Sequence, residues 1–231
     1  MGFPEVQNNS IDLVIADPPF GINFDKGNNY NRTNDSREGY LEIKSDNYQY
    51  FCYSKFMDLK RVIKPEAVIV WFSACVTKDK VEDRLMTVLE AAKQAGLYRQ
   101  RDIIWGYQFG VYNPTNFTIS HQHVLMFTVH PDITFKWNGH YEEDAVYLKR
   151  KYNHGIKTNI TETNEELTKW LISLLSYKGD IILDPFFGSG TTGKVCSELE
   201  RNCIGYEINT NMRDRISEKL KGIEYQVIQN G

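Results

Sequence analysis

Continuous apolar runs alternate along most of the chain with stretches in which apolar residues recur at helical spacing. Buried strands are predicted at 11–16, 67–72, 101–108, 123–129, 181–186 and 203–208. Helices are predicted at 50–63, 78–95, 165–177, 191–199 and 211–220, with Pro65 stopping the first and Gly96 ending the second. Strands that alternate with helices predict an α/β fold with a doubly wound, mainly parallel sheet.

Some segments depart from this alternation. Residues 21–50 are rich in Asn, Asp, Ser and Gly and have no helical period, so a long functional or disordered loop is expected. Residues 131–159 are polar and irregular, with scattered aromatic residues. Little helix separates the two strands before residue 130, which predicts an antiparallel pair at the end of the sheet. Residues 225–228 are a candidate last strand.

The composition is that of an ordinary globular chain. It has 231 residues, of which 41% are hydrophobic and 25% charged, and one domain of residues 1–231 is expected. The net charge of −3 argues against nucleic-acid binding by bulk charge alone. The chain contains no apolar run of about 20 residues and does not begin like a signal peptide. Its scattered cysteines indicate reduced thiols and a cytoplasmic protein: Cys52, Cys75, Cys196 and Cys203.

Two of the predicted strands end in an Asp-Pro-aromatic sequence. The first runs into Asp17-Pro18-Pro19-Phe20 and the other into Asp184-Pro185-Phe186. Ligands of open parallel sheets bind outside the carboxyl ends of the strands. The two ends therefore predict one cleft with two halves, one for a cofactor and the other for the group that is modified.

A glycine-rich turn follows the second of these strands. Residues 188–193 fit the pattern G-x-G-x-x-G, and Glu207 lies nineteen residues after Gly188, where it suits the two hydroxyls of a ribose. A nicotinamide dinucleotide fits this pattern. A nucleoside triphosphate fits less well, because Val195 follows Lys194 where a phosphate loop needs a hydroxyl. S-adenosylmethionine carries an ammonium and a sulfonium, which suit a carboxylate at Asp184; a pyrophosphate does not.

The first strand end suits methylation of an amine. The exocyclic amine of adenine is a poor nucleophile, because its lone pair is delocalised into the ring. Its lone pair faces the methyl donor when both amine protons point at fixed acceptors, and the Asp17 carboxylate and the Pro18 carbonyl are such acceptors. Pro19 stiffens the turn, and Phe20 can stack on an extruded base for about 1–3 kcal/mol.

Together these motifs resemble the β group of DNA adenine-N6 and cytosine-N4 amino-methyltransferases, in which the catalytic motif precedes the cofactor motif. The resemblance extends to residues 46–65, to 121–127, which are similar to the family's "HEhvlvF" strand, and to 165–193 and 201–207. It implies a class I, Rossmann-like methyltransferase fold with permuted motif order. It also implies S-adenosylmethionine as cofactor and adenine as target, because cytosine enzymes more often carry Ser in place of Asp17. The residues it assigns to the cofactor, with their neighbours in the turn, are Asp184, Pro185, Phe186, Gly188, Ser189, Gly190, Thr191, Thr192 and Glu207.

The chain departs from the family in two places. Family members usually begin with a strand that ends in an acid contacting the cofactor adenine. Here either the start is truncated or residues 225–228 supply this strand, with Asn230 in the place of the acid. The family's "HPTQKP" corresponds to residues 159–164, where Thr161 keeps the hydroxyl and is predicted to contact the cofactor, although the Lys and Pro are replaced.

We expect DNA to be the partner. Residues 131–159 form a short candidate recognition region, which suggests recognition of a few base pairs or the help of a second chain or homodimer. Basic residues in this region and in the loop 24–50 are predicted to contact DNA: Lys26, Arg32, Arg37, Lys149, Arg150 and Lys151. His121 and His123 point to one side of a strand, but without a third ligand a polar contact or packing is expected rather than a metal.

The sequence thus predicts an adenine-N6 DNA methyltransferase that acts after base flipping. The alternatives are a cytosine-N4 enzyme, an amine methyltransferase acting on RNA or protein, a dehydrogenase, and a cofactor-binding subunit that needs a partner.

Overall fold

The computed structural model describes residues 2–21, 43–74, 77–78, 82–111, 117–149 and 163–228. Its centre is a seven-stranded sheet in the order β7-β5-β6-β2-β1-β8-β9. The strands are β1 (Ile11–Ala16), β2 (Ile63–Ser73), β5 (Tyr98–Val111), β6 (Ile119–Thr128), β7 (Ala145–Tyr147), β8 (Ile181–Asp184) and β9 (Asn202–Gly205). β1 pairs in parallel with β2 and β8, and β8 with β9, as predicted for a doubly wound sheet.

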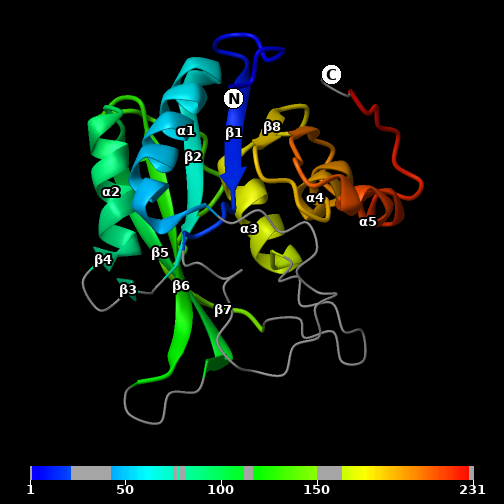
Figure 1. Cartoon of the computed structure of the whole chain (residues 1–231). Helices are drawn as coiled ribbons and strands as arrows, with labels where there is room; N and C mark the ends of the chain where they lie inside the picture. The colour runs from blue at the N-terminus through cyan, green and yellow to red at the C-terminus, as the bar shows by residue number, and fades with distance from the viewer. Residues whose placement is uncertain are drawn as a thin grey trace.

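Helices cover both faces of the sheet (Figure 1). A short 3-10 turn, η3 (Ser45–Asn47), leads into α1 (Tyr48–Val62), which lies with α2 (Arg84–Gln94) over one face. On the other side lie α3 (Glu165–Leu175), α4 (Thr191–Glu198) and α5 (Arg213–Lys219), the last preceded by η4 (Thr210–Met212).

Side chains that alternate along the strands fill two cores. Val14, Ile69 and Leu183 pack with the α1 and α2 side, whereas Leu13, Val70 and Ile182 pack with α3 and α4. Because strand residues alternate between faces, a strand buried on both sides reads as a continuous apolar run. The described ranges contain no helix long and apolar enough to cross a membrane.

Several predicted boundaries differ from the structure, two of them for a clear physical reason. β2 begins at Ile63 rather than residue 67, so Pro65 does not separate helix from strand. It lies inside β2, in a stretch where the pairing with β1 is interrupted and a missing N–H costs no ladder bond. The second helix begins at Arg84 rather than residue 78, because the Asp83 side chain caps it by accepting the N–H groups of Leu85 and Met86. Two-residue strands, β3 (Thr77–Lys78) and β4 (Glu82–Asp83), precede it.

The strands at the edges of the sheet also differ from the sequence prediction. β5 and β6 form the expected antiparallel pair, but β7 lies outside them, parallel to β5. Residues 225–228 form no strand, since their backbone joins no sheet and Tyr225, Val227 and Ile228 are 42%, 61% and 74% exposed. The prediction that they replace the family's opening strand is therefore wrong.

Candidate active site

The two Asp-Pro strand ends lie side by side. β1 and β8 are parallel neighbours, with Leu13 opposite Ile182 and Val14 opposite Leu183. Asp17, directly after β1, and Asp184, the last residue of β8, therefore lie at the same end of the sheet. The negative charge of Asp17 helps to raise the pKa of Asp184. The prediction that the two motifs lie at the same end of the sheet is confirmed.

The Asp184 carboxyl is buried in its own turn. It is 5% exposed, and its oxygens accept the N–H of Phe186 at 2.9 Å and the hydroxyl of Thr192 at 2.6 Å. Burial raises the pKa of Asp184 to about 7; the two hydrogen bonds oppose the rise, while the charges of Asp17 and Glu207 add to it. Asp184 thus organises the glycine turn and contributes charge from within it.

The glycines in and beside the turn have two different roles. Gly188 and Gly190 have positive φ angles of 52° and 87°, which side chains rarely adopt, and α4 begins directly after Gly190. Gly193 and Gly205 instead make room for the ring of Phe187, which any Cβ at these positions would overlap. The sequence pattern G-x-G-x-x-G therefore combines a tight turn with the packing of α4 against β9.

Glu207 joins β9 to the glycine turn. Its carboxylate accepts the N–H of Gly188 and the N–H of Asn209, each at 2.7 Å. Burial raises its pKa, and these backbone bonds oppose the rise. The turn is further tied to β9 by backbone bonds from Phe187 N to Tyr206 O and from Tyr206 N to Asp184 O, both 2.9 Å. Glu207 therefore lies at the turn, as its spacing predicted.

One contact of the glycine turn, made by a lysine of α5, was not predicted from the sequence. Lys219, in α5, donates to the hydroxyls of Ser189 at 3.1 Å and Thr191 at 3.2 Å. Both hydroxyls are buried, and the ammonium brings a positive charge to a site that is otherwise acidic. The only signal was a lysine near the end of a predicted surface helix, which by itself does not point inward.

The turn after β1 is held from two sides. Thr163 donates to Asp17 at 3.0 Å from the segment before α3, and Arg84 donates to the carbonyl of Gly21 at 2.7 Å. Pro18 is buried, and Pro19 and Phe20 are half-buried. The Asp17 side chain and the Gly21 backbone at the end of this turn are thus held by the segment before α3 and by α2.

The remaining predicted residues divide into two groups. Pro185 is buried, and Phe186 packs edge-on against Trp71 with ring centres 5.8 Å apart, so this aromatic residue contacts the core. Lys149 lies exposed after β7. The other predicted contacts fall outside the described residues: Thr161 and Asn230 for the cofactor, and Lys26, Arg32, Arg37, Arg150 and Lys151 for DNA.

Part of the candidate recognition region is bound to the sheet. Lys136 donates to Asp12 at 2.8 Å and to both oxygens of Asp180 at 2.7 and 2.8 Å, and Lys64 donates to Asp12 at 2.7 Å. Burial alone would raise the pKa of Asp12, but Lys136, Lys64 and the Ile181 N–H together lower it. Lys136 therefore anchors residues 131–149 rather than presenting its charge to a ligand.

One histidine of the pair His121 and His123 contacts a carboxylate. His123 Nδ1 lies 2.9 and 3.0 Å from the oxygens of Asp102, and the rings of His121 and His123 are 5.3 Å apart. Where the structure describes the chain, no three His, Cys, Asp or Glu side chains are grouped to hold a metal ion.

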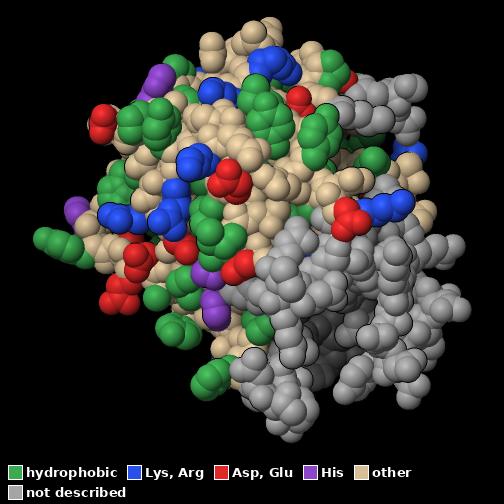
Figure 2. Space-filling model, turned by 60° about the vertical axis from the view of Figure 1, so that its left-hand side comes forward, with side chains coloured by type: hydrophobic (Ala, Val, Ile, Leu, Met, Phe, Trp, Pro, Cys, Tyr) green, Lys and Arg blue, Asp and Glu red, His purple; other side chains and the backbone are tan. Residues whose placement is uncertain are grey.

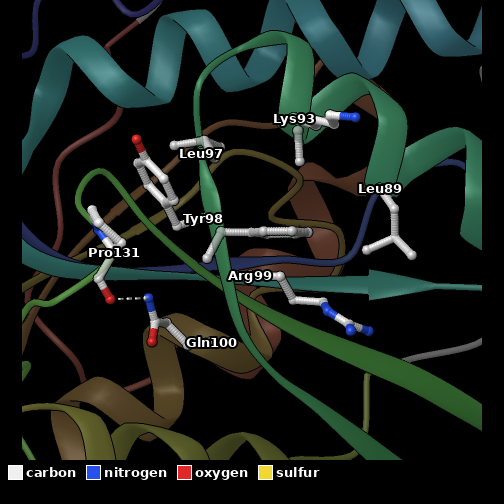
Figure 3. A pocket seen from close by; sticks show the side chains of 9 residues that line it. Leu89, Lys93, Leu97, Tyr98, Arg99, Gln100 and Pro131 are labelled. Carbon is white, nitrogen blue, oxygen red and sulfur yellow. Dashed lines mark hydrogen bonds between the residues drawn. The ribbon is translucent and has the colours of Figure 1, made fainter.

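Among the described residues, one face of the molecule carries side chains of both charges. Basic and acidic side chains are interspersed on the face seen in Figure 2. A hollow of about 420 Å³ is lined by Leu89, Lys93, Leu97, Tyr98, Arg99 and Pro131, among others; their side chains are drawn in Figure 3. Tyr98, the first residue of β5, pairs with Thr128, the last residue of β6. This end of β6 lies toward the N-terminal end of β2, whereas Asp17 follows the carboxyl end of β1, which is parallel to β2. The hollow is therefore remote from the candidate active site.

Comparison with known proteins places these motifs in a family. A family model described as DNA methylase, of the N6/N4 methyltransferases, matches residues 11–219. The type II methyltransferase M.HpaI of Haemophilus parainfluenzae is 29% identical over 93% of this chain and 69% of its own length. The chain spans about two thirds of the length of the curated relatives it matches.

Solved structures share the fold. The cytosine-N4-specific PvuII DNA methyltransferase superposes with a TM-score of 0.76 at 16% identity, covering 96% of this chain and 84% of its own. The M1.HpyAVI–SAM complex gives 0.63 at 19% identity, covering 92% and 90%. This likeness confirms the Rossmann-like α/β fold, and the family match extends over both strand-end motifs. The chain belongs to the N6/N4 family of DNA methylases.

Proposed function

We propose that this chain transfers a methyl group from S-adenosylmethionine to the exocyclic N6 amine of adenine in DNA. The observation that carries the proposal is the placement of Asp17 and Asp184 at the ends of two adjacent parallel strands. One end then serves the amine and the other the cofactor, at the edge where open α/β sheets bind their ligands.

The chemistry of the second strand end fits the cofactor. Three carboxyl groups lie near one another here: Asp184, Glu207 and Asp17. Burial raises the pKa of Asp184, and the negative charges of Asp17 and Glu207 raise it further. A ligand with a sulfonium and an ammonium relieves this repulsion, whereas the phosphates of a dinucleotide would increase it. Glu207 is placed to accept hydrogen bonds from a ribose, and the relative M1.HpyAVI is described as a SAM complex. When bound, the cofactor supplies an electrophilic methyl group.

The first strand end fits the amine. The carboxylate of Asp17 and the carbonyl of Pro18 each accept one N–H of the target amine, which directs its lone pair toward the cofactor half of the site. Asp17 then takes up the proton that the nitrogen loses after the transfer. Phe20 stacks on the flipped base. Such fixed positioning supplies up to about 7–11 kcal/mol of the barrier reduction.

Adenine is favoured over cytosine by Asp17, since the cytosine-N4 enzymes of the family more often carry Ser at this position. Cytosine N4 is the second candidate, because the PvuII enzyme, described as cytosine-N4-specific, shares the fold with a TM-score of 0.76. We propose that DNA is contacted by Lys149 with Arg150 and Lys151, and by the loop that carries Lys26, Arg32 and Arg37. A second chain or a homodimer completes target recognition.

The test of the target base uses unmethylated DNA incubated with the protein and S-adenosylmethionine and then digested to nucleosides for mass spectrometry. N6-methyladenine is the expected product. N4-methylcytosine would transfer the assignment to the second candidate. Transfer to neither base, with cofactor binding intact, would contradict both assignments for the chain acting alone.

A further inference from the structure

Asp17 is hydrogen-bonded to Thr163, which stands where the family's "HPTQKP" segment has its Lys. Thr163 Oγ1 donates to Asp17 Oδ2 at 3.0 Å, although 146 residues separate them in the sequence. Both residues are only partly buried, so neither is in place merely because the core encloses it. The contact joins the strand end of β1 to the segment that leads into α3.

Thr163 is itself held by the start of a helix. Asn164 caps α3 by accepting the N–H of Leu167 at 2.9 Å, and it donates to the carbonyl of Lys149 at 2.8 Å. Asn164 is 5% exposed, and Leu167 and Leu171 bury the first turns of α3 in the core. The position of the Thr163 hydroxyl is therefore set by a capped, buried helix start.

We propose that Thr163 is a positioning residue for Asp17, an inference that rests on the proposed function. A hydrogen bond to one carboxylate oxygen restrains rotation about the Cβ–Cγ bond, and so it also favours one direction for the second oxygen. A target amine then meets an acceptor that needs no reorientation, which is how preorganised polar groups lower a barrier. The contribution belongs to the chemical step, not to the binding of cofactor or DNA.

A pair of variants separates the hydroxyl from the shape of the side chain. Thr163→Val keeps the shape and removes the donor, and we expect kcat to fall about tenfold or more, the factor that corresponds to 1.36 kcal/mol of barrier. KM for DNA and Kd for S-adenosylmethionine should stay within about twofold, because the bond acts on the chemical step. Thr163→Ser keeps the donor and should restore kcat to within about threefold of the unchanged protein.

Three results would overturn the inference: an unchanged kcat in Thr163→Val, equal losses in the Val and Ser variants, or a loss confined to KM or to cofactor affinity. Crystal structures add a readout independent of activity, since the Asp17 carboxylate should rotate in the Val variant and stay in place in the Ser variant. A carboxylate that keeps its orientation in Thr163→Val would contradict the positioning role. Asp17→Ala distinguishes the two proposals, because full activity in that variant refutes the proposed function itself.

Discussion

The carboxylate of Glu207 accepts the backbone N–H of Gly188 at 2.7 Å, so the second residue after β9 closes the glycine turn after β8. We expect Glu207→Gln to weaken binding of S-adenosylmethionine by about 10- to 100-fold, because hydrogen bonds to a charged group contribute about 1.5–3 kcal/mol. Calorimetric titration measures this change. Glu200→Gln is a matched control, since Glu200 pairs with Lys178 on the surface; equal affinity in both variants would contradict the role of Glu207.

The raised pKa of Asp184 predicts a pH dependence of stability. Its pKa is about 7 in the folded chain, against 3.8 for the ordinary side chain. Between these values the folded state retains a proton that the unfolded state has released, so the free energy of unfolding falls as pH rises through this window. Asp184→Asn, which resembles the protonated side chain, should reduce this fall. Urea unfolding at several pH values between 4 and 8 tests it; an unchanged slope would refute the burial argument.

The ring of Phe187 predicts a compensating pair of substitutions. A Cβ at Gly205 would overlap this ring, so Gly205→Ala should lower the free energy of unfolding by about 1–3 kcal/mol. Phe187→Leu replaces the ring with a smaller aliphatic side chain. The double variant should therefore recover some of the stability lost by Gly205→Ala. Thermal unfolding of the two single variants and the double variant gives the coupling. Strict additivity would mean that the ring does not determine the choice of glycine.

Two lysines of the segment 131–149 should respond differently to the same substitution. Lys136→Met removes a partner of nearly buried Asp12 and of Asp180 and should cost about 3 kcal/mol of stability. This contribution is lost in acid as pH falls through the lowered pKa of Asp12.

Exposed Lys149 is the matched comparison. Lys149→Met should leave stability within about 0.5 kcal/mol and reduce the salt dependence of DNA binding by about one phosphate contact. Denaturation and DNA titration at several salt concentrations measure both effects. Lost DNA affinity in a fully stable Lys136→Met would instead place Lys136 in the recognition surface.

The sequence predicts most strongly what depends on local pattern. The run before Asp17 and the run before Asp184 each read as buried strands, and parallel strands bring their ends to one edge, as β1 and β8 do. The spacing of Glu207 from the glycine turn was informative for the same reason.

Contacts between distant segments could not be predicted in this way. The bond from Thr163 to Asp17 spans 146 residues, and the bond from Lys136 to Asp12 spans 124. Thr163 lies in the segment that corresponds to the family's "HPTQKP", but it replaces the motif's Lys, and Lys136 belongs to no motif, so nothing local indicated either contact. Residues 225–228 show the converse error: their apolar side chains suggest a strand, but pairing with a sheet edge is a tertiary contact that local sequence does not determine.

We propose that the two strand ends have separate roles: Asp17 acts on the amine, and Asp184 and Glu207 hold the cofactor. The most direct test measures cofactor binding by calorimetry and methyl transfer from labelled S-adenosylmethionine into unmethylated DNA on the same preparation of Asp17→Asn. We expect an unchanged Kd for the cofactor together with a loss of transfer of at least about 100-fold, because Asp17 is a positioned proton acceptor. Full transfer by this variant, or loss of transfer that merely follows loss of cofactor binding, would contradict it.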